Sequence, residues 1–340
     1  MLKSTAVGRP VVVAGAGSIG CLVGGLLAAA GRPVALLARP RLIDEIEING
    51  LNVTSFEGAR HEIAPRQLTL SGDGRILAEA RVVLVTVKSA DTAGIADTIA
   101  RHAPEDAVIV SLQNGVGNVA VLRECLPGRK VLAGMVPFNV IASGAGRFHR
   151  ATSGDIVIER DDADTANALS VPGLKVRTTS DIIGVQWGKL LVNLNNAINA
   201  LSGLTLREQL AQRGWRTLLA DQIAEGLRAV KAQGIAPVSA TPVPASLMPH
   251  LLRLPDPLFA IVLGRTTKID PQARSSMAED LQRGRRTEID YLQGVITAIA
   301  EREGLQVPLS RRIVALIKRA EAAGEGSPRL TPAEIRSVPI

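Results

Sequence analysis

Residues 10–31 read PVVVAGAGSIGCLVGGLLAAAG, and this stretch decides the fold of the first half of the chain. Its β-branched beginning, residues 10–14, predicts a strand, and the apolar residues 21–30 before the last glycine predict a helix. Between them, residues 15–20 spell GAGSIG, a match to GxGxxG, and residues 33–38 predict a second strand. Strand, glycine turn, helix and strand within about thirty residues are typical of a dinucleotide-binding unit.

Each glycine of this motif has an expected task. We expect Gly15 to allow the tight turn, Gly17 to let a pyrophosphate approach the backbone, and Gly20 to let the helix pack closely on the strand. Ser18 and Ile19 lead into the predicted helix, whose first N–H groups have no acceptor within the helix and can bind phosphate. The loop from Gly15 to Gly20 is therefore predicted to bind the cofactor.

The end of the second strand indicates which nucleotide is favoured. An NAD site usually has Asp or Glu there, whereas this chain has Ala38, Arg39, Pro40 and Arg41. A guanidinium at Arg39 can bind a 2′-phosphate through two hydrogen bonds, so NADPH is the expected cofactor. The alternative is that both arginines are ordinary solvated loop charges.

Composition excludes several other classes of protein. The chain has 340 residues, a formal net charge of +7, 46% hydrophobic and 2% aromatic residues, which is normal for a globular protein of two domains. The basic residues are dispersed and the rings are few, so we expect no nucleic-acid partner. Cys21 and Cys125 have no metal-type spacing, so we expect no metal site and a reducing, cytoplasmic location.

The apolar stretch at residues 10–31 also permits two other interpretations. It resembles a signal peptide or membrane span, but its six glycines and the strand-like run that follows argue against both, so no membrane association is expected. Ser18 sits in a turn similar to the nucleophile elbow of a hydrolase. No histidine of the chain stands in a catalytic context, which argues against a hydrolase.

Further strands and helices alternate along the first domain. Residues 81–88 and 107–112 predict buried strands, with an amphipathic helix at 91–102 between them, so the fold class is α/β with a doubly wound parallel sheet. Lys88 and Asn114 follow the two strands, where ligands bind in such sheets. Position alone leaves a cofactor role and an ordinary loop role equally open. Short strands between residues 131 and 177 predict an antiparallel edge.

The second half is predicted to be helical. The pattern indicates helices at about 182–201, 206–233, 273–303 and 308–323, with a proline-rich stretch at 237–257 that must be a loop or broken helices. We therefore place a nucleotide-binding domain at residues 1–180 and an all-helical domain at 181–340, with the active site expected between them.

Two of these helices carry candidate functional residues. Lys189 and Asn193 are four residues apart on an otherwise apolar helix, which favours a polar cleft, although a lysine with its amine in solvent is the alternative. On the predicted helix 273–303, Ser276, Asp280 and Glu288 fall within a sector of roughly 120°. Such a face is equally normal for a surface helix.

Taken in order, the motifs resemble the ketopantoate reductase family over nearly the whole chain. The matching segments are GAGSIG at 15–20, VTVKS at 85–89, QNG at 113–115, WGKLLVN at 187–193, SSM at 275–277 and TEIDY at 287–291. The resemblance implies a Rossmann domain followed by a helical domain, NADPH as hydride donor, reduction of 2-dehydropantoate (ketopantoate) to pantoate, and a place in pantothenate biosynthesis.

The resemblance also implies roles for individual residues. Lys189 resembles the family's general acid, which protonates the carbonyl oxygen, and Glu288 and Asn193 resemble its partners in binding the substrate. Ser276 resembles the group that binds the substrate carboxylate, and Lys88 and Asn114 match positions near the nicotinamide ribose and the substrate. One position departs from the family pattern, because a second asparagine expected four residues after Asn193 is Ala197 here.

The departure keeps other functions open. A related reductase of another 2-keto or imino acid is the nearest alternative, and a protein that senses NADP without turnover is a more distant one. Apolar helices in the second domain are compatible with a homodimer, but the spacing of the residues does not require one.

Overall fold

The protein is described by a computed structural model that covers residues 8–162, 164–239, 243–266 and 272–339, with the side chains of 262–266 left aside. The chain divides into two compact units, residues 1–182 and 183–340.

The first unit is built on an eight-stranded sheet in the order β12-β11-β8-β7-β6-β1-β2-β5. Six neighbouring strands of this sheet run parallel to one another, in the order β8, β7, β6, β1, β2 and β5. The unit also contains a four-stranded sheet in the order β4-β3-β10-β9. The elements of this unit are β1 Val11–Ala14, α1 Ser18–Ala29, β2 Val34–Leu37, α2 Pro40–Asn49, β3 Leu51–Ser55, β4 Arg60–Ile63, η1 Pro65–Gln67, β5 Thr69–Ser71, η2 Gly74–Glu79, β6 Val82–Val85, η3 Ser89–Asp91, α3 Thr92–His102, β7 Val108–Ser111, α4 Asn118–Cys125, β8 Val131–Met135, β9 Val140–Ala142, β10 Arg147–Arg150, β11 Ile156–Glu159, α5 Thr165–Leu169 and β12 Val176–Thr179.

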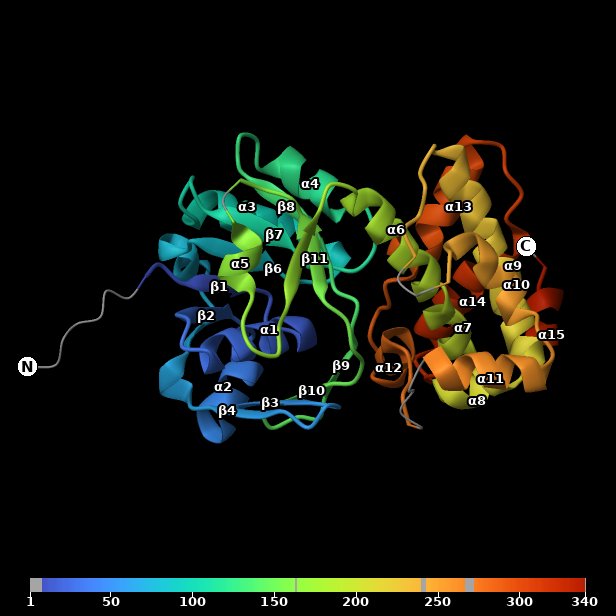
Figure 1. Ribbon diagram of the computed structural model, residues 1–340, viewed down its shortest axis with the longest axis horizontal. Helices are drawn as coiled ribbons and strands as arrows, with labels where there is room; N and C mark the ends of the chain where they lie inside the picture. The colour runs from blue at the N-terminus through green and yellow to red at the C-terminus, as the bar shows by residue number, and fades with distance from the viewer. Residues whose placement is uncertain (1–7, 163, 240–242, 267–271, 340) are drawn as a thin grey trace, which may run out of the picture. The chain divides into compact units, whose positions relative to one another are not determined.

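Helices cover both faces of the large sheet (Figure 1). Side chains alternate along β1, so Val11 and Val13 join the core under α1, whereas Val12 and Ala14 join the core under α3 and α4. All four residues of β1, β6 and β7 are buried, as expected for strands covered on both faces. The predicted α/β fold of Rossmann type is confirmed.

Helix α1 is apolar all round because it lies between two sheets. A Cβ atom at Gly24 would come within 2.8 Å of Leu36 in the large sheet, and one at Gly25 within 2.6 Å of Val53 in the small sheet. The glycines therefore allow close packing on both sides. Because both sides of α1 are covered by sheets, residues 10–31 carry no charged side chain, which is why they resembled a membrane span.

The edge of the sheet differs from the prediction. Strand β8 is parallel to β7, and β12 is parallel to β11. Within the large sheet only the pair of β8 and β11 is antiparallel. Strands β9 and β10 belong to the small sheet, where β10 pairs with β3 and β9 pairs with β10. The sequence pattern did not identify these segments as strands.

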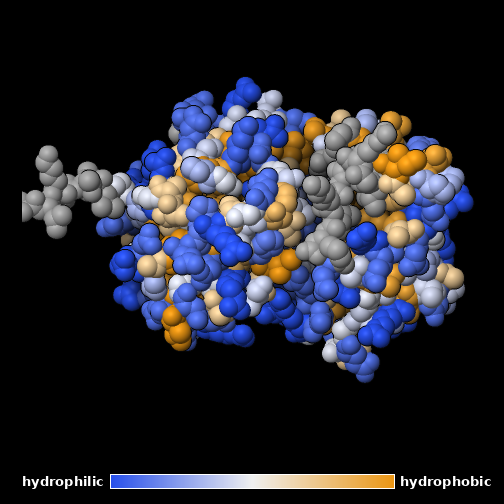
Figure 2. Space-filling model, turned by 60° about the horizontal axis from the view of Figure 1, so that its bottom comes forward, coloured by the Kyte–Doolittle hydropathy of each residue, from blue (hydrophilic) through white to orange (hydrophobic). Residues whose placement is uncertain are grey.

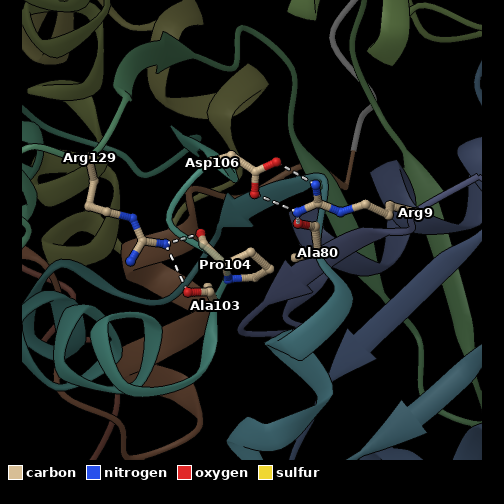
Figure 3. Close-up of polar contacts among 6 residues, drawn as sticks. All are labelled: Arg9, Ala80, Ala103, Pro104, Asp106 and Arg129. Carbon is tan, nitrogen blue, oxygen red and sulfur yellow. Dashed lines mark hydrogen bonds and ion pairs between the residues drawn. The ribbon is translucent and has the colours of Figure 1, made fainter.

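Charged side chains join the amino ends of the parallel strands (Figure 3). Before β1, Arg9 donates to both carboxylate oxygens of Asp106, at 2.5 and 2.9 Å, and to the carbonyl oxygen of Ala80 at 2.7 Å. Arg129, before β8, donates to the carbonyl oxygens of Ala103 and Pro104. These contacts connect the segments that lead into β1, β6, β7 and β8.

The regular elements described in the second unit are all helices, as predicted. They are α6 Ile182–Asn193, which starts at the last residue of the first unit, α7 Asn195–Ser202, α8 Leu206–Ala211, α9 Arg213–Ala232, η4 Ala245–Leu247, α10 Met248–Leu252, α11 Asp256–Thr266, α12 Ser276–Gln282, η5 Ile289–Tyr291, α13 Gln293–Arg302, α14 Pro308–Ala323 and α15 Pro332–Ser337. The predicted helix at 308–323 is confirmed, and the proline-rich stretch contains short helices.

The long helices predicted at 182–201, 206–233 and 273–303 are each interrupted. The first breaks at Leu194, the second at Gln212, and the third ends at Gln282, well before α13. After α12 the chain turns through Gly284, whose φ of +60° favours glycine. Residue pattern alone merged the helices across the first two breaks, whereas residues 282–288 at the third break contain Gly284 and no hydrophobic residue.

Hydrophilic residues predominate on the face shown in Figure 2, with hydrophobic residues interspersed among them. Across the described residues, none of the helices combines the length and the apolar character needed to cross a membrane.

Candidate active site

Two of the three glycines in the loop are tightly packed against other residues, and the third faces open space. Gly15 has φ of +96°, and a Cβ atom there would come within 2.4 Å of the Val87 side chain. At Gly20 a Cβ atom would lie 2.7 Å from Thr86 Oγ1. At Gly17 the nearest atom is the carbonyl oxygen of Gly15, 4.0 Å away. Packing therefore requires the first and last glycines, while the middle one leaves room for a ligand.

The beginning of α1 supplies hydrogen-bond donors beside this room. Cys21 is the first residue whose N–H bonds within the helix, to the carbonyl oxygen of Gly17 at 2.8 Å. The N–H groups of Ser18, Ile19 and Gly20 therefore precede the intrahelical ladder, and no acidic residue stands in the first turn. This is the arrangement that binds phosphate at a helix N-terminus, so the loop fits a dinucleotide pyrophosphate.

Arg39 stands at the carboxyl end of β2, as the nucleotide assignment requires. It is the N-cap residue of α2 and is exposed, and it forms no ion pair within the described part of the chain. Arg41 differs, because its Nε lies 3.1 Å from Glu45 on the same helix. Arg41 therefore has a partner on its own helix, which suits an ordinary surface role, and Arg39 stays the candidate for a 2′-phosphate contact.

Lys88 and Asn114 follow neighbouring strands at the same edge. Both are exposed, Lys88 as the residue before η3 and Asn114 in the loop between β7 and α4. The loop after β6 also contacts the glycine loop, since Thr86 Oγ1 donates to the carbonyl oxygen of Gly15 at 2.6 Å. Loops after β1, β6 and β7 thus meet at the carboxyl edge.

The candidate acid lies in the second unit, on α6. Lys189 is half-buried, and burial lowers the pKa of its amine to about 8. Asn193, one turn later, is 7% exposed. Gly188 lets residues 237–239 lie against the helix, because a Cβ atom there would be 1.7 Å from the carbonyl oxygen of Val238. The N–H of Val238 donates to the carbonyl oxygen of Gly184 at 2.8 Å, so this segment lies along the helix that carries Lys189.

Ser276 is located by contacts with α7. It is exposed and begins α12, and the preceding Ser275 caps that helix by accepting from the N–H of Ala278 at 3.2 Å. Ser275 also donates its hydroxyl to the carbonyl oxygen of Asn196 and its N–H to Asn199 Oδ1, each at 2.9 Å. The start of α12 is thus attached to the helix that follows Lys189 and Asn193.

The predicted common face of Ser276, Asp280 and Glu288 is wrong. Asp280 shares α12 with Ser276, but Glu288 lies beyond the end of that helix, as the half-buried residue before η5. A helical angle calculated across this break has no meaning, so any approach of Glu288 to the site must come from tertiary packing.

Ala197 and Asn193 lie on different helical elements. Its side chain is fully buried on α7, and Leu194 separates that helix from the one that carries Asn193. The four-residue spacing from Asn193 therefore crosses a break. Gln293, which the sequence analysis did not single out, is fully buried and donates to the carbonyl oxygen of Leu194 at 2.8 Å.

No cluster of three or more histidine, cysteine, aspartate or glutamate side chains suited to a metal ion occurs within the ranges that the structure covers. The polar groups brought together at the carboxyl edge are instead backbone N–H groups, amides and basic side chains, which suit an anionic organic ligand.

This geometry defines a Rossmann-type dinucleotide-binding protein. The family model described as ketopantoate reductase PanE/ApbA matches residues 11–162, and the model of its C-terminal part matches residues 181–321. The chain therefore belongs to the ketopantoate reductase family, a family of oxidoreductases, and the resemblance inferred from the motifs is confirmed. Family and fold together support a nicotinamide cofactor.

Two similar proteins illustrate the relationship. The chain is 31% identical over 323 residues to the 2-dehydropantoate 2-reductase of Halobacterium salinarum, covering 92% of this chain and 99% of the relative. The crystal structure of a PanE/ApbA family ketopantoate reductase from Ralstonia eutropha is 29% identical, with a TM-score of 0.79 over 93% of this chain and 99% of the other.

The fold extends to an enzyme with a different name. The structure of D-mandelate dehydrogenase with NADH and anilino(oxo)acetate matches with a TM-score of 0.76 over 93% of this chain and 99% of the other. At 19% identity this match concerns the fold alone.

Proposed function

We propose that the protein reduces 2-dehydropantoate to pantoate with NADPH, and that Lys189 is the general acid. The observation that carries this proposal is the half-buried amine of Lys189, whose lowered pKa of about 8 suits proton donation near neutral pH. NADPH is favoured over NADH by the exposed guanidinium of Arg39 at the end of β2.

The proposed mechanism assigns each step to residues of this chain. A bound NADPH supplies the hydride that arrives at the keto carbon. The glycine loop and the start of α1 bind the pyrophosphate, and Lys88 and Asn114 contact the nicotinamide end. Lys189 stabilises the negative charge that develops on the carbonyl oxygen and protonates it. Asn193 and Glu288 orient the substrate, and Ser276 binds its carboxylate.

The division of labour between the units is part of the proposal. Residues 1–180 are the cofactor domain and residues 181–340 the substrate and dimerisation domain. Both the homodimer and the cytoplasmic location remain predictions, which light scattering and cell fractionation would test.

Removal of the Lys189 amine tests the proposal directly. We expect Lys189→Ala to lower kcat by about two orders of magnitude or more and to leave the Kd for NADPH nearly unchanged. The measurement is NADPH oxidation with 2-dehydropantoate, beside a fluorescence titration of NADPH. A parallel loss of NADPH binding would show a structural lysine, and full activity of the variant would exclude the acid role.

A related reductase of another 2-keto acid is the second candidate. Ala197 favours it, because a fully buried methyl group stands where the family pattern has an asparagine. A panel of branched and aryl 2-keto acids, compared by kcat/KM, separates the two candidates. Preference for 2-dehydropantoate supports the first, and preference for another keto acid transfers the mechanism to that substrate.

A further inference from the structure

Four buried polar residues join the loop after β6 to the loop after β7. They are Ser89, Thr92, Gln113 and Asn118, each between 2% and 6% exposed, and we call them the amide–hydroxyl network. Their placement is unusual for uncharged polar side chains, which are costly to bury unless hydrogen bonds satisfy them.

Gln113 forms the first half of the network. Its Nε2 donates to Thr92 Oγ1 at 2.8 Å and to the carbonyl oxygen of Val87 at 3.2 Å. Its Oε1 accepts from Ser111 Oγ at 3.0 Å. Both ends of the amide are therefore satisfied, and the carbonyl oxygen of the residue directly before Lys88 is held by a side chain from the next loop.

Thr92, Ser89 and Asn118 form the second half. Thr92 Oγ1 lies 2.7 Å from the carbonyl oxygen of Ser89, to which it donates, and 3.1 Å from Asn118 Oδ1. Asn118 Nδ2 donates to Ser89 Oγ at 3.2 Å and to the carbonyl oxygen of Asn114 at 2.7 Å. Ser89 Oγ lies 3.2 Å from the same Asn114 oxygen.

The network ends on the backbone carbonyl groups of Asn114 and of Val87, the residue before Lys88. Lys88 lies between Val87, whose carbonyl oxygen accepts from Gln113, and Ser89, which belongs to the network. The carbonyl oxygen of Asn114 accepts from two network residues, Ser89 and Asn118. Val87 also packs against the glycine loop, because a Cβ atom at Gly15 would come 2.4 Å from its side chain. The three carboxyl-edge loops are thereby fixed together.

We propose that Ser89, Thr92, Gln113 and Asn118 are positioning residues of the cofactor site, which hold Lys88 and Asn114 in the arrangement that receives the nicotinamide end. The inference rests on the proposed function for the identity of the ligand. The network carries no formal charge, so it fixes the backbone without adding charge of its own at an edge that binds an anion.

The test uses two threonines of the same helix. Thr92→Val keeps the shape of the side chain and removes the central hydroxyl of the network. Thr98→Val is the matched control, because Thr98 is partly exposed and donates to the carbonyl oxygen of Gly94 in its own helix α3. Both variants are made in the full chain, with melting temperature as the check on folding.

We expect Thr92→Val to raise the Kd for NADPH by about tenfold, the effect of one or two net hydrogen bonds, and Thr98→Val to change it by less than about twofold. The KM for the keto acid should change less than the KM for NADPH. Thr92→Ser, which restores the hydroxyl, should recover most of the affinity. Equal Kd values for the two valine variants would overturn the inference.

A double-mutant cycle with Lys88→Ala separates positioning from general stability. If the network acts through Lys88, Thr92→Val should cost less in the Lys88→Ala background than in the original chain. Full additivity contradicts that role. If Thr92→Val does not fold, Ser89→Ala replaces it in the same cycle, because it removes one hydroxyl and little volume.

The result also distinguishes this inference from the proposed function. A protein that binds neither NADPH nor NADH overturns both. A protein that binds and oxidises NADPH, with Thr92→Val no weaker than Thr98→Val, overturns the positioning role alone.

Discussion

The two edges of the parallel sheet are held by opposite kinds of chemistry. At the amino edge, charged side chains form the connections, with the exposed Arg9 on Asp106 and the half-buried Arg129 on two carbonyl oxygens. At the carboxyl edge, the connections are buried and neutral, through the amide–hydroxyl network and the packing of Gly15 on Val87. A charged clamp at the carboxyl edge would place its own ions where a ligand's charge must enter.

The difference between the two edges predicts which of them can be substituted without loss of ligand binding. Exposed ion pairs contribute little because water and salt screen them. Buried neutral hydrogen bonds contribute less by their net strength than by the penalty of leaving a partner unsatisfied. The amino edge should therefore tolerate substitution, and the carboxyl edge should lose ligand binding before it loses its fold.

The largest effect is expected at the carboxyl edge. Gly17→Asp adds a carboxylate beside the start of α1, in space where the protein offers no clash, so we expect NADPH affinity to fall by about 100-fold or more with little change in melting temperature. Titration of NADPH and thermal unfolding measure the two quantities. Gly17→Ala is the uncharged control, and a large loss of stability in both variants would contradict the open space.

The pH dependence tests the chemistry separately from both edges. Because the pKa of Lys189 is about 8, the acid loses its proton above that pH, and kcat should fall up to tenfold per pH unit. The lowered pKa also means that the folded state binds fewer protons than the unfolded state between about pH 8 and 10.5, so this group makes stability rise with pH there. A kcat that stays constant from pH 7 to 10 would argue against Lys189 as the acid.

Arg39→Ala should have an intermediate effect at the carboxyl edge. We expect about tenfold weaker binding of NADPH, from the loss of a charge-assisted contact to the 2′-phosphate, and little change for NADH. Arg41→Ala is the matched control, because Arg41 already pairs with Glu45. Similar losses for both nucleotides would remove the proposed role of Arg39.

The smallest effect is expected at the amino edge. Arg9→Gln removes an exposed ion pair, so the melting temperature should shift by only about 2 °C or less and NADPH affinity should not change. The hydrogen bond from Arg9 lowers the pKa of Asp106, so the contribution of the pair is present above the normal aspartate pKa and is lost as pH falls through the lowered value. Thermal unfolding at pH 7 and pH 3 checks both statements, and a large shift at pH 7 would break the comparison.

Local patterns were sufficient for the central strands of the large sheet. Buried parallel strands are short β-branched runs, and the predictions at 81–88 and 107–112 contain β6 and β7. The small sheet was missed because its strands carry polar residues and because β3 pairs with β10, far away in sequence. The breaks at Leu194 and Gln212 left no interruption in the apolar periodicity, so the helices were merged.

Some residues of the candidate site could likewise be predicted from the sequence, and others could not. Motif residues such as Gly17, Arg39 and Lys189 could be named because the chemistry of a glycine, a guanidinium or an amine depends on residue type and local position. The residues that hold them could not, since an internal asparagine or glutamine such as Asn118 or Gln293 resembles any surface amide until packing shows that it is buried.

The sequence by itself determined strands β1, β2, β6 and β7, helices α1 and α3, the glycine turn and the family, because these depend on neighbours along the chain. Only the tertiary structure decided that α1 lies between two sheets, that Glu288 is on a different element from Ser276, and that four neutral side chains join two loops. Those features arise from contacts between distant residues, which hydrophobic periodicity and residue spacing do not record.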